Sequence, residues 1–377
     1  MKITFVTGNW VSLSGGPRVV SIYAEYLHRC GHEVLVVCPK RRTPGIYEQI
    51  RSFLKGNGLI SLNKKKGSHF DGLAVPRKVL KHKSPVTNHD VPDADVVIAC
   101  WWETAEWVSA LSDTKGAKVY FIQGHEVHSH LPVARCRATY YLPLHKIVIA
   151  KWLRDVMRTE YGDTVVDLVP NSVNHNQFFA ELRGKQAVPT LGFLYSPVKL
   201  KGVDITLKAI DLLRERFPNL RVIAFGARTP ERGSDFDSRI EFHHSPEQEC
   251  IRDLYAQCDV WVTASRTEGF NLTAMEAMAC RTPVVSTKTG WPEEAVVNGE
   301  NGFLVDVDDV VALTECVASV FSRSDEDWRM MSQNAFDTVK KSSWQASANL
   351  FEKALQHACR RAKKGEIAGV CTCSLSD

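Results

Sequence analysis

The sequence lacks any apolar run long enough to cross a membrane. None of its apolar stretches approaches the roughly 18 residues that a spanning helix needs. The apolar segment 3–6 is also far too short for the core of a secretory signal peptide. We therefore expect a cytoplasmic protein.

The eleven cysteines show no pairing pattern. They are odd in number and scattered, and no Cys-x-x-Cys motif occurs among them. This usage is typical of reduced, mostly buried thiols in a cytosolic protein. Cys371 and Cys373 lie in a polar tail where metal binding is conceivable, but we expect the protein to need no metal and no other cofactor.

The common phosphate-binding signatures are missing as well. The loop after the first apolar run contains Gly8, Gly15 and Gly16, but it is not a Gly-x-Gly-x-x-Gly motif and no Walker lysine follows it. A dinucleotide-dependent dehydrogenase is therefore not expected. By itself the loop is also compatible with an ordinary turn between a strand and a helix.

The net charge is only +4, but basic residues are concentrated in one segment. Residues 40–83 hold twelve lysines or arginines against Glu48 and Asp71. Such a patch attracts phosphate-bearing acceptors, anionic lipid headgroups or nucleic acid, or it is simply a solvated surface. No zinc-finger, RRM or helix-turn-helix pattern accompanies the charge, so we expect no nucleic acid partner.

Short apolar runs rich in β-branched residues alternate with helical stretches twice over. The predicted strands are 2–7, 33–38, 95–99, 118–122, 146–150 and 165–169, then 190–195, 221–225, 239–242, 260–264, 283–286 and 302–305. Continuous apolar runs are typical of parallel strands that are buried on both faces. Two such series predict two doubly wound α/β domains.

A short polar linker at 183–186 separates the two series. We predict a first domain over residues 1–183 and a second over 187–343. A final helix is predicted at 344–364, and residues 366–377 are expected to be disordered.

Two carboxylates stand eight positions apart around the predicted start of a helix. Residues 268–271 are predicted to form a tight loop, and residues 272–279 a helix. The first turn of a helix has free N–H groups and a positive dipole end, which suit a phosphate or diphosphate. Glu268 and Glu276 would flank that anion and accept hydrogen bonds from sugar hydroxyls. This arrangement suits a nucleotide-diphosphate sugar, and the alternative is two solvated glutamates.

The spacing of Glu268 and Glu276 resembles the Glu-x7-Glu signature of retaining glycosyltransferase family 4, the group 1 glycosyl transferases. Gly290 and the turn at 298–302 also stand at the usual places of that family. The resemblance implies the GT-B fold, with two Rossmann-like domains and a C-terminal helix that crosses back onto the first. It implies that the first domain binds the acceptor and the second binds the nucleotide sugar.

The start of the second domain matches the family in part. Lys201, directly before Gly202, matches a lysine that neutralises the leaving diphosphate. The arginine of the family is absent, because its expected place holds Ser196 or Tyr195. Lys199 is the candidate substitute, although an ammonium cannot offer the two-pronged contact of a guanidinium.

His125 and Glu126 follow a predicted strand of the first domain. In the family a residue here, often histidine, approaches the donor sugar and the reacting centre. Together with His128 and His130 they could also suggest a metal site. The resemblance implies that no metal is needed.

The resemblance as a whole implies a metal-independent, retaining transfer of a hexosyl or deoxyhexosyl group from a nucleotide-diphosphate sugar to a glycan, lipid-linked or other acceptor. The catalytic candidates are Glu268, Lys201 and His125. The substrate-binding candidates are Gly15, Gly16, Glu126, Lys199, Gly269, Phe270, Asn271, Leu272 and Glu276. The basic segment adds a peripheral contact with an anionic membrane, at the inner face of the cell membrane.

Two alternatives stay open at this point. A nucleotide-sugar 2-epimerase would share the fold but need no acceptor, and a non-catalytic GT-B protein would only bind sugar nucleotides. The missing arginine favours the second alternative, whereas the intact Glu268, Glu276 and Lys201 argue against it. Residues 306–308 match the Asp-x-Asp metal motif of another glycosyltransferase fold, but we predict a turn there.

Overall fold

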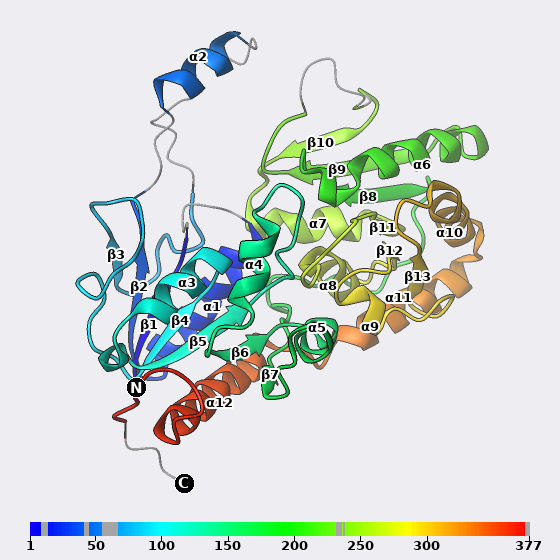
Figure 1. Cartoon of the computed structure of the whole chain (residues 1–377). Coiled ribbons are helices and arrows are strands. Elements are labelled where there is room, and N and C mark those ends of the chain that lie inside the picture. Colours follow the sequence, from blue (N-terminus) through cyan, green and yellow to red (C-terminus); the bar gives the residue numbers. More distant parts are fainter. Residues whose placement is uncertain (9–13, 41–44, 55–66, 231–235, 237, 374–377) are drawn as a thin grey trace. The chain divides into compact units, whose positions relative to one another are not determined.

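The computed structural model describes residues 1–8, 14–40, 45–54, 67–230, 236 and 238–373 (Figure 1). The chain divides into two compact units. Unit 1 comprises Met1–Val148, Arg154–Val169 and Ala348–Asp377, and unit 2 comprises Ile149–Leu153 and Pro170–Ser347. Each unit contains a sheet of parallel strands, which confirms the predicted doubly wound α/β class.

The described part of unit 1 holds a seven-stranded sheet in the order β3-β2-β1-β4-β5-β6-β7. Its strands are β1 (Lys2–Val6), β2 (Glu33–Cys38), β3 (Arg77–Val79), β4 (Val96–Ala99), β5 (Ala117–Ile122), β6 (His145–Val148) and β7 (Val166–Leu168). Strands β4 and β5 are buried at every position, which explains the unbroken apolar sequence of β4 and a β5 sequence that only Lys118 interrupts. The sequence pattern misses β3, because all three of its residues are exposed and two are charged.

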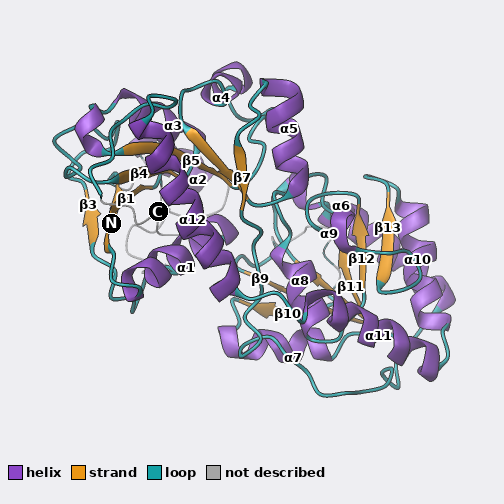
Figure 2. Cartoon of the chain, turned by 90° about the horizontal axis from the view of Figure 1, so that it is seen from below, coloured by secondary structure: helices purple, strands orange, loops and turns teal. Residues whose placement is uncertain are grey.

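The last helix completes the core of unit 1. The other helices here are α1 (Gly15–Arg29), α2 (Ile46–Leu54), α3 (Trp102–Ala110), α4 (Val133–Thr139) and most of α5 (Lys151–Tyr161), and α12 (Trp344–Lys363) joins them from Ala348 onward. Phe351 stacks on Tyr23 of α1 with ring centroids 4.4 Å apart, and it meets Phe121 of β5 edge to face at 5.1 Å. The predicted return of the C-terminal helix is therefore confirmed, with α12 beside α1 (Figure 2).

The described part of unit 2 holds a six-stranded sheet in the order β10-β9-β8-β11-β12-β13. Its strands are β8 (Thr190–Leu194), β9 (Arg221–Gly226), β10 (Glu241–His244), β11 (Val260–Thr263), β12 (Val284–Thr287) and β13 (Gly302–Val305). The helices of this unit are α6 (Val203–Arg216), α7 (Ile251–Ala256), α8 (Leu272–Ala279), α9 (Pro292–Ala295), α10 (Val310–Ser322) and α11 (Asp325–Val339). Within the described ranges, no helix of either unit combines the length and the apolar character needed to span a bilayer.

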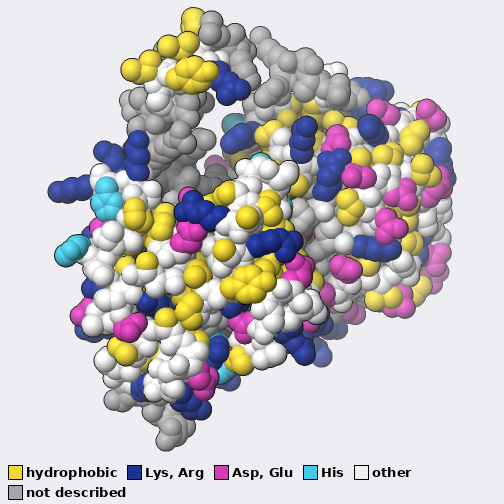
Figure 3. Space-filling view, viewed as in Figure 1, with side chains coloured by type: hydrophobic (Ala, Val, Ile, Leu, Met, Phe, Trp, Pro, Cys, Tyr) yellow, Lys and Arg dark blue, Asp and Glu magenta, His cyan; other side chains and the backbone are white. Residues whose placement is uncertain are grey.

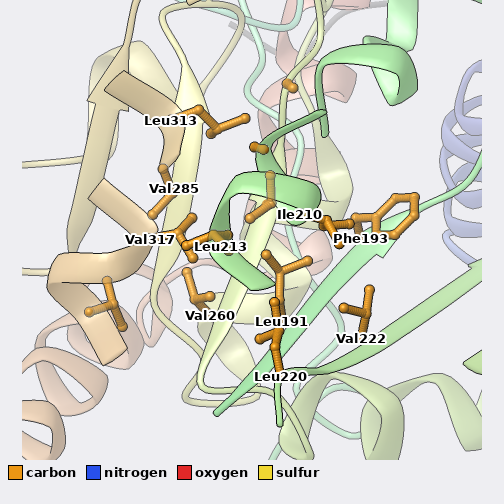
Figure 4. Close-up of a cluster of buried hydrophobic side chains, with 14 of the residues drawn as sticks. Leu191, Phe193, Ile210, Leu213, Leu220, Val222, Val260, Val285, Leu313 and Val317 are labelled. Atoms are coloured by element: carbon orange, nitrogen blue, oxygen red, sulfur yellow. The ribbon is translucent and has the colours of Figure 1, made fainter. Parts of the chain in front are cut away.

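A cluster of buried hydrophobic side chains joins the sheet and helices of unit 2 (Figure 4). Leu213 of α6 and Val317 of α10 are both fully buried and belong to the same cluster as Val260 of β11 and Val285 of β12. This packing fixes the two central strands, β8 and β11, relative to their helices. The loops that leave these strands therefore start from rigid positions.

The strand order of each sheet reverses at one point. Strand β1 pairs with both β2 and β4, and strand β8 pairs with both β9 and β11. In open α/β sheets, ligands bind in the crevice at the carboxyl ends of the strands at such a reversal. Helix α1 follows β1, while the short 3₁₀ helix η2 (Lys199–Lys201) follows β8 and the loop 264–271 follows β11. The motifs predicted to bind the donor thus leave the two strands at the reversal of unit 2.

Part of the C-terminal tail is ordered against unit 1. The N–H of Ala368 donates to the Pro143 carbonyl at 3.0 Å, and the N–H of Lys118 donates to the Ala368 carbonyl at 3.1 Å. The N–H of Val370 donates to the Asp113 carbonyl at 3.1 Å. Residues 366–373 therefore depart from the expected disorder, because backbone groups distant in sequence satisfy their polar groups. Residues 374–377 lie outside the described residues.

Replacement of Gly202 by alanine should destabilise unit 2. Gly202 has φ +59°, and a Cβ there would lie 1.8 Å from the carbonyl oxygen of Ala264, which is backbone and cannot rotate away. Gly299 is a matched control, because it is also left-handed at φ +82° but has its nearest heavy atom at 3.9 Å. In urea unfolding, G299A should cost about 1 kcal/mol from backbone strain alone. G202A should cost clearly more, and equal losses would contradict the close approach.

Candidate functional site

The loop between β11 and α8 carries the first candidate carboxylate. Lys201 Nζ donates to both oxygens of Glu268, at 2.7 and 2.9 Å, and Ser265 Oγ donates to Glu268 Oε1 at 2.7 Å. The Glu268 side chain is only 11% exposed, and that of Lys201 is 35% exposed. The structure therefore brings two of the predicted catalytic residues into direct contact, although 67 positions separate them.

Asn271 turns the chain into helix α8. Its backbone is left-handed, with φ 77° and ψ 67°, which is uncommon for a residue other than glycine. The side chain offsets this conformation, because Oδ1 accepts from the N–H of Ala274 at 3.3 Å and Nδ2 donates to Thr263 Oγ1 at 3.0 Å. Helix α8 begins at Leu272 as predicted, so the positive end of its dipole adjoins the loop that carries Glu268.

Glu276 lies in the second turn of α8 and is 4% exposed. Its Oε2 accepts a hydrogen bond of 3.0 Å from the hydroxyl of Tyr255, a fully buried residue of α7. Burying a carboxylate costs free energy unless hydrogen bonds compensate for the lost water. The alternative of two solvated glutamates is therefore wrong for both Glu276 and Glu268.

The loop 268–271 is held by contacts from several other segments. A Cβ on Gly290, which has φ +67°, would lie 2.8 Å from the Phe270 carbonyl oxygen and 2.9 Å from Glu268 Cβ, so only glycine fits. The N–H of Trp291 donates to that Phe270 carbonyl at 2.8 Å. Trp152 Nε1 donates to the Gly269 carbonyl at 3.0 Å. These contacts fix the backbone between the two carboxylates.

Arg266 ties the loop to η2 and was not among the predicted site residues. Its N–H donates to the Leu200 carbonyl at 2.8 Å, and its Nη1 donates to the Lys199 carbonyl at 2.6 Å. The guanidinium also binds both carboxylate oxygens of Asp204, at 3.0 and 2.7 Å, and Nε contacts Asp308 at 2.7 Å. Arg266 therefore positions the backbone before Lys201. Arg266 does not stand at the expected place of the absent family arginine, which holds Ser196 or Tyr195.

The Asp-x-Asp sequence at 306–308 forms a turn, as predicted. Asp306 pairs with Lys288 at 2.7 Å, and Asp308 pairs with Arg266. Lys199, the candidate substitute for the missing arginine, is exposed in the first residue of η2. Its proposed contact with a diphosphate stays a prediction.

In unit 1, Gly15 and Gly16 form the first residues of α1, after Ser14 in the N-cap position. A Cβ on Gly16 would meet the amide of the Gln123 side chain at 3.8 Å, an ordinary contact. The preceding residues 9–13 lie outside the described residues. The glycines thus stand at a helix N-terminus that follows β1, and their contact with a donor or acceptor stays a prediction.

His125 lies just after β5 and is half-buried against aromatic rings. Its Nε2 is 2.7 Å from the hydroxyl of Tyr161. Burial lowers the pKa of the imidazole below its usual value, so His125 is neutral near pH 7. A neutral imidazole can donate or accept a hydrogen bond but adds no charge to a reaction centre.

Glu126 is more deeply buried than its neighbour, with 7% exposure. The N–H of Trp102, at the start of α3, donates to Glu126 Oε2 at 3.1 Å. Burial raises the pKa of this carboxyl to about 8, so the group is largely protonated at neutral pH. The observed contact is with backbone, and the predicted substrate contact of Glu126 remains untested.

The suggested histidine metal site does not assemble in the described part of unit 1. The His128 and His130 rings lie parallel with centroids 5.6 Å apart. His125 contacts Tyr161 instead, and the carboxyl group of Glu126 contacts backbone. The groups of metal-ligand type that do converge within the described ranges involve other residues.

Comparison with known proteins links part of the chain to a family. Residues 186–323 match the family model described as glycosyl transferases group 1. The matched region lies within unit 2 and contains Lys201, Glu268 and Glu276. The D-inositol 3-phosphate glycosyltransferase of Corynebacterium jeikeium is 30% identical over 191 residues, which are 47% of this chain and 45% of the relative. That of Corynebacterium efficiens is 33% identical over 176 residues, which are 42% and 41% of the two chains. The chain therefore matches less than half the length of these curated relatives.

Solved structures extend the likeness over nearly the whole chain. Sucrose-phosphate synthase from Thermosynechococcus elongatus superposes with a TM-score of 0.72 at 15% identity, covering 95% of this chain and 99% of that one. The Anabaena protein HepE, in complex with UDP-glucose, gives a TM-score of 0.71 at 16% identity, covering 95% and 100%. At such low identity these matches show the fold, and the predicted GT-B fold is confirmed.

Three contributors to the candidate site have no signal in the sequence pattern. Ser265 and Arg266 precede the glutamate signature, but nothing in their spacing shows that they bind Glu268 and η2. Tyr255 reaches Glu276 from another helix. Such partners are set by how strands and helices pack, which a local pattern cannot reveal.

We predict different kinetic effects for the two glutamates. Glu276→Gln should raise KM for the donor about tenfold or more, because a hydrogen bond to a charged group contributes about 1.5–3 kcal/mol. Glu268→Gln should instead lower kcat, because its predicted partner is the reacting sugar. The exposed Glu300 of the same unit provides a control, and Glu300→Gln should leave both constants unchanged. Wild-type kinetics in both site variants would overturn the donor-site assignment.

We also predict that Glu126 makes stability depend on pH. Its folded pKa of about 8 lies above the ordinary value of 4.5, so its stabilising contribution is complete below pH 4.5 and is lost as pH rises toward 8. Glu126→Gln cannot ionise. As the pH rises from 4.5 to 8, the free energy of unfolding of the wild type should therefore fall relative to that of E126Q. The expected fall is on the order of a few kcal/mol. Parallel pH profiles of the two proteins would contradict the raised pKa.

Proposed function

We propose that this protein is a retaining glycosyltransferase that moves a hexosyl or deoxyhexosyl group from a nucleoside-diphosphate sugar to an acceptor, without a metal ion. The observation that carries the proposal is the pair of sequestered carboxylates, Glu268 and Glu276, on either side of the α8 N-terminus, with Lys201 bound to the first. The family match spans all three positions and supports the same reaction class.

Each part of this arrangement has a chemical role in the proposal. Glu276 accepts hydrogen bonds from the ribose diol of the nucleotide, and Glu268 accepts them from the transferred sugar. The first turn of α8 and the ammonium of Lys201 stabilise negative charge on the departing diphosphate. The bond from the sugar to the diphosphate oxygen breaks while the acceptor oxygen bonds to the same face. The acceptor proton passes to a phosphate oxygen of the leaving group, so no protein base is required.

A UDP-hexose is the donor class to test first. The Anabaena protein HepE, which shares the fold, was solved with UDP-glucose, and TarM of S. aureus was solved with UDP. Neither likeness defines the sugar of this chain. Thermal-shift measurements across UDP-, GDP- and TDP-sugars should single out the donor, because a mismatched hydroxyl leaves a buried polar group unpaired.

The deciding experiment uses the nucleotide sugar that raises the Tm most in the thermal-shift screen. It measures nucleotide release from that donor with and without a panel of glycan and lipid-linked acceptors. Release that depends on an acceptor supports the proposed transfer. Conversion of the nucleotide sugar to its 2-epimer without an acceptor would instead identify an epimerase. Donor binding with neither outcome would point to a non-catalytic protein. Glu268→Gln serves as the control for contaminating activity.

We predict that the transfer proceeds without added Mg²⁺ or Mn²⁺. Lys201 and the helix terminus supply the positive charge that a metal provides in Asp-x-Asp enzymes. The assay should therefore give the same rate in EDTA as in Mg²⁺ or Mn²⁺. Loss of activity in EDTA that either of these ions restores would overturn this part of the proposal.

For the acceptor, we propose that the basic segment 40–83 contacts an anionic membrane or a lipid-linked acceptor. Helix α2 within this segment exposes Ile46, Tyr47, Ile50 and Phe53, at 82%, 77%, 52% and 64%. In Figure 3, hydrophobic side chains lie at the surface where Figure 1 draws α2. Apolar and basic side chains together favour attachment to an anionic bilayer surface.

We predict that charge and apolar contact both contribute to this attachment. Lys64, Lys65 and Lys66 lie outside the described residues, but their joint replacement by Gln should weaken binding to anionic liposomes, more so at low salt. Ile50→Ser combined with Phe53→Ser should weaken it at all salt concentrations. Val311, which is 67% exposed in unit 2, supplies the control V311S. Unchanged liposome binding in both variants would leave this segment as a solvated surface.

A further inference from the structure

Three cysteine sulfurs come together where the tail meets unit 1. Cys359 lies on α12 and is fully buried, Cys371 is 7% exposed, and Cys373 is half-buried. The Sγ atoms of all three lie within 4.8 Å of one another, and those of Cys371 and Cys373 are 3.0 Å apart. All eleven cysteines are free thiols in the structure, so no disulfide competes for these sulfurs. This cluster differs from isolated buried cysteines because three potential ligand atoms face one point.

We propose that Cys359, Cys371 and Cys373 form a zinc site that fastens the C-terminal tail to unit 1. A tetrahedral zinc ion with Zn–S bonds of about 2.3 Å holds its sulfurs about 3.8 Å apart. One sulfur separation is 3.0 Å and the others do not exceed 4.8 Å, so small side-chain rotations are enough to bind the ion. Each thiol releases its proton to solvent on binding, and a water molecule completes the fourth position.

The surroundings of the cluster hold the ligands in place. The Cys359 thiol is 3.7 Å from the Asp95 carbonyl oxygen, and Thr372 Oγ1 donates to Asp95 Oδ1 at 3.1 Å. The other Asp95 oxygen accepts from the N–H of Lys2 at 2.7 Å. Lys363 Nζ donates to the Cys373 carbonyl at 2.7 Å, which places a positive charge near thiolates that carry excess negative charge. Cys359 and Cys371 are buried, whereas Cys373 is half-buried. We therefore expect an ion to enter beside Cys373.

The remaining tail contacts explain why such an ion would matter. Gly369 has φ +96°, and a Cβ there would lie 2.0 Å from the carbonyl oxygen of Gly116, so the tail runs directly against the backbone before β5. This region lies at the amino-terminal ends of β4 and β5, where the tail hydrogen bonds with 113–118. His125, by contrast, follows the carboxyl end of β5. The inferred zinc is therefore structural, and it is separate from the metal-free transfer proposed for the donor site.

Zinc content provides the direct test. The full chain is purified with a reductant, stripped of metal, incubated with Zn²⁺ and desalted before elemental analysis. We expect about one zinc ion per chain. C371S and C373S should each lose most of it, and both are preferable to a change at the fully buried Cys359. The exposed Cys30 and Cys250 are matched controls, and C30S and C250S should retain the ion.

Two further measurements separate a built site from adventitious thiol binding. Co²⁺ in place of Zn²⁺ should give visible bands of tetrahedral coordination and near-ultraviolet thiolate charge transfer, and C371S should lose both. Zinc should also raise the Tm of the wild type but not of the C371S/C373S variant, because only the wild type gains binding energy in the folded state. A wild type that retains no zinc, or a double variant that retains as much as the wild type, would overturn the proposal. A Cys371–Cys373 disulfide that persists under reductant would overturn it as well.

Discussion

The ion pair between Lys201 and Glu268 is the contact on which the rest of the candidate site depends. It joins η2, which follows β8, to the loop that follows β11, and these strands are neighbours at the reversal of the sheet order. At such a reversal the two following loops diverge, and nothing in the backbone hydrogen bonding of the sheet links them. The ion pair and the contacts of Arg266 provide that link. The position of the α8 N-terminus relative to Lys201 follows from it.

This arrangement costs free energy, and a contribution to folding stability does not account for its presence. Glu268 and Glu276 are both largely removed from water, and Asn271 between them holds a left-handed backbone. Replacing buried ionic pairs with apolar side chains is often neutral or stabilising in proteins, so their presence is weak evidence of a stabilising role. Strained backbone is tolerated where surrounding contacts fix it, and such strain gathers at functional loops. Here the contacts from Trp152, Trp291 and Gly290 fix the backbone of the loop 268–271.

The sequence predicts those features that depend on neighbouring residues. The bounds of α8 follow from its run of Ala, Leu, Met and Glu, and strands such as β2 and β13 follow from local apolar runs. Short-range patterns fail where a distant partner decides the structure. Strand β3 has no apolar residue except Val79 and forms by pairing with β2. The tail binds backbone groups near β5, and the Cys359 thiol that meets it lies in a helix otherwise defined by its apolar face. The carboxylate pair was predictable from spacing, whereas its partners Tyr255 and Ser265 were not.

The missing arginine has a definite consequence for the proposed chemistry. Arg266 lies beside η2, and its guanidinium nitrogens bind Asp204, Asp308 and a backbone carbonyl, so it positions the backbone before Lys201. In the proposed transfer, positive charge for the leaving diphosphate would come from Lys201, from the exposed Lys199 and from the α8 N-terminus. An ammonium is a point charge, whereas a guanidinium donates hydrogen bonds to two oxygens in fixed directions. We therefore infer that the backbone N–H groups of α8 would orient the diphosphate. Asn271 and the loop contacts fix that helix start, which in the proposed reaction would let lysines serve in place of an arginine.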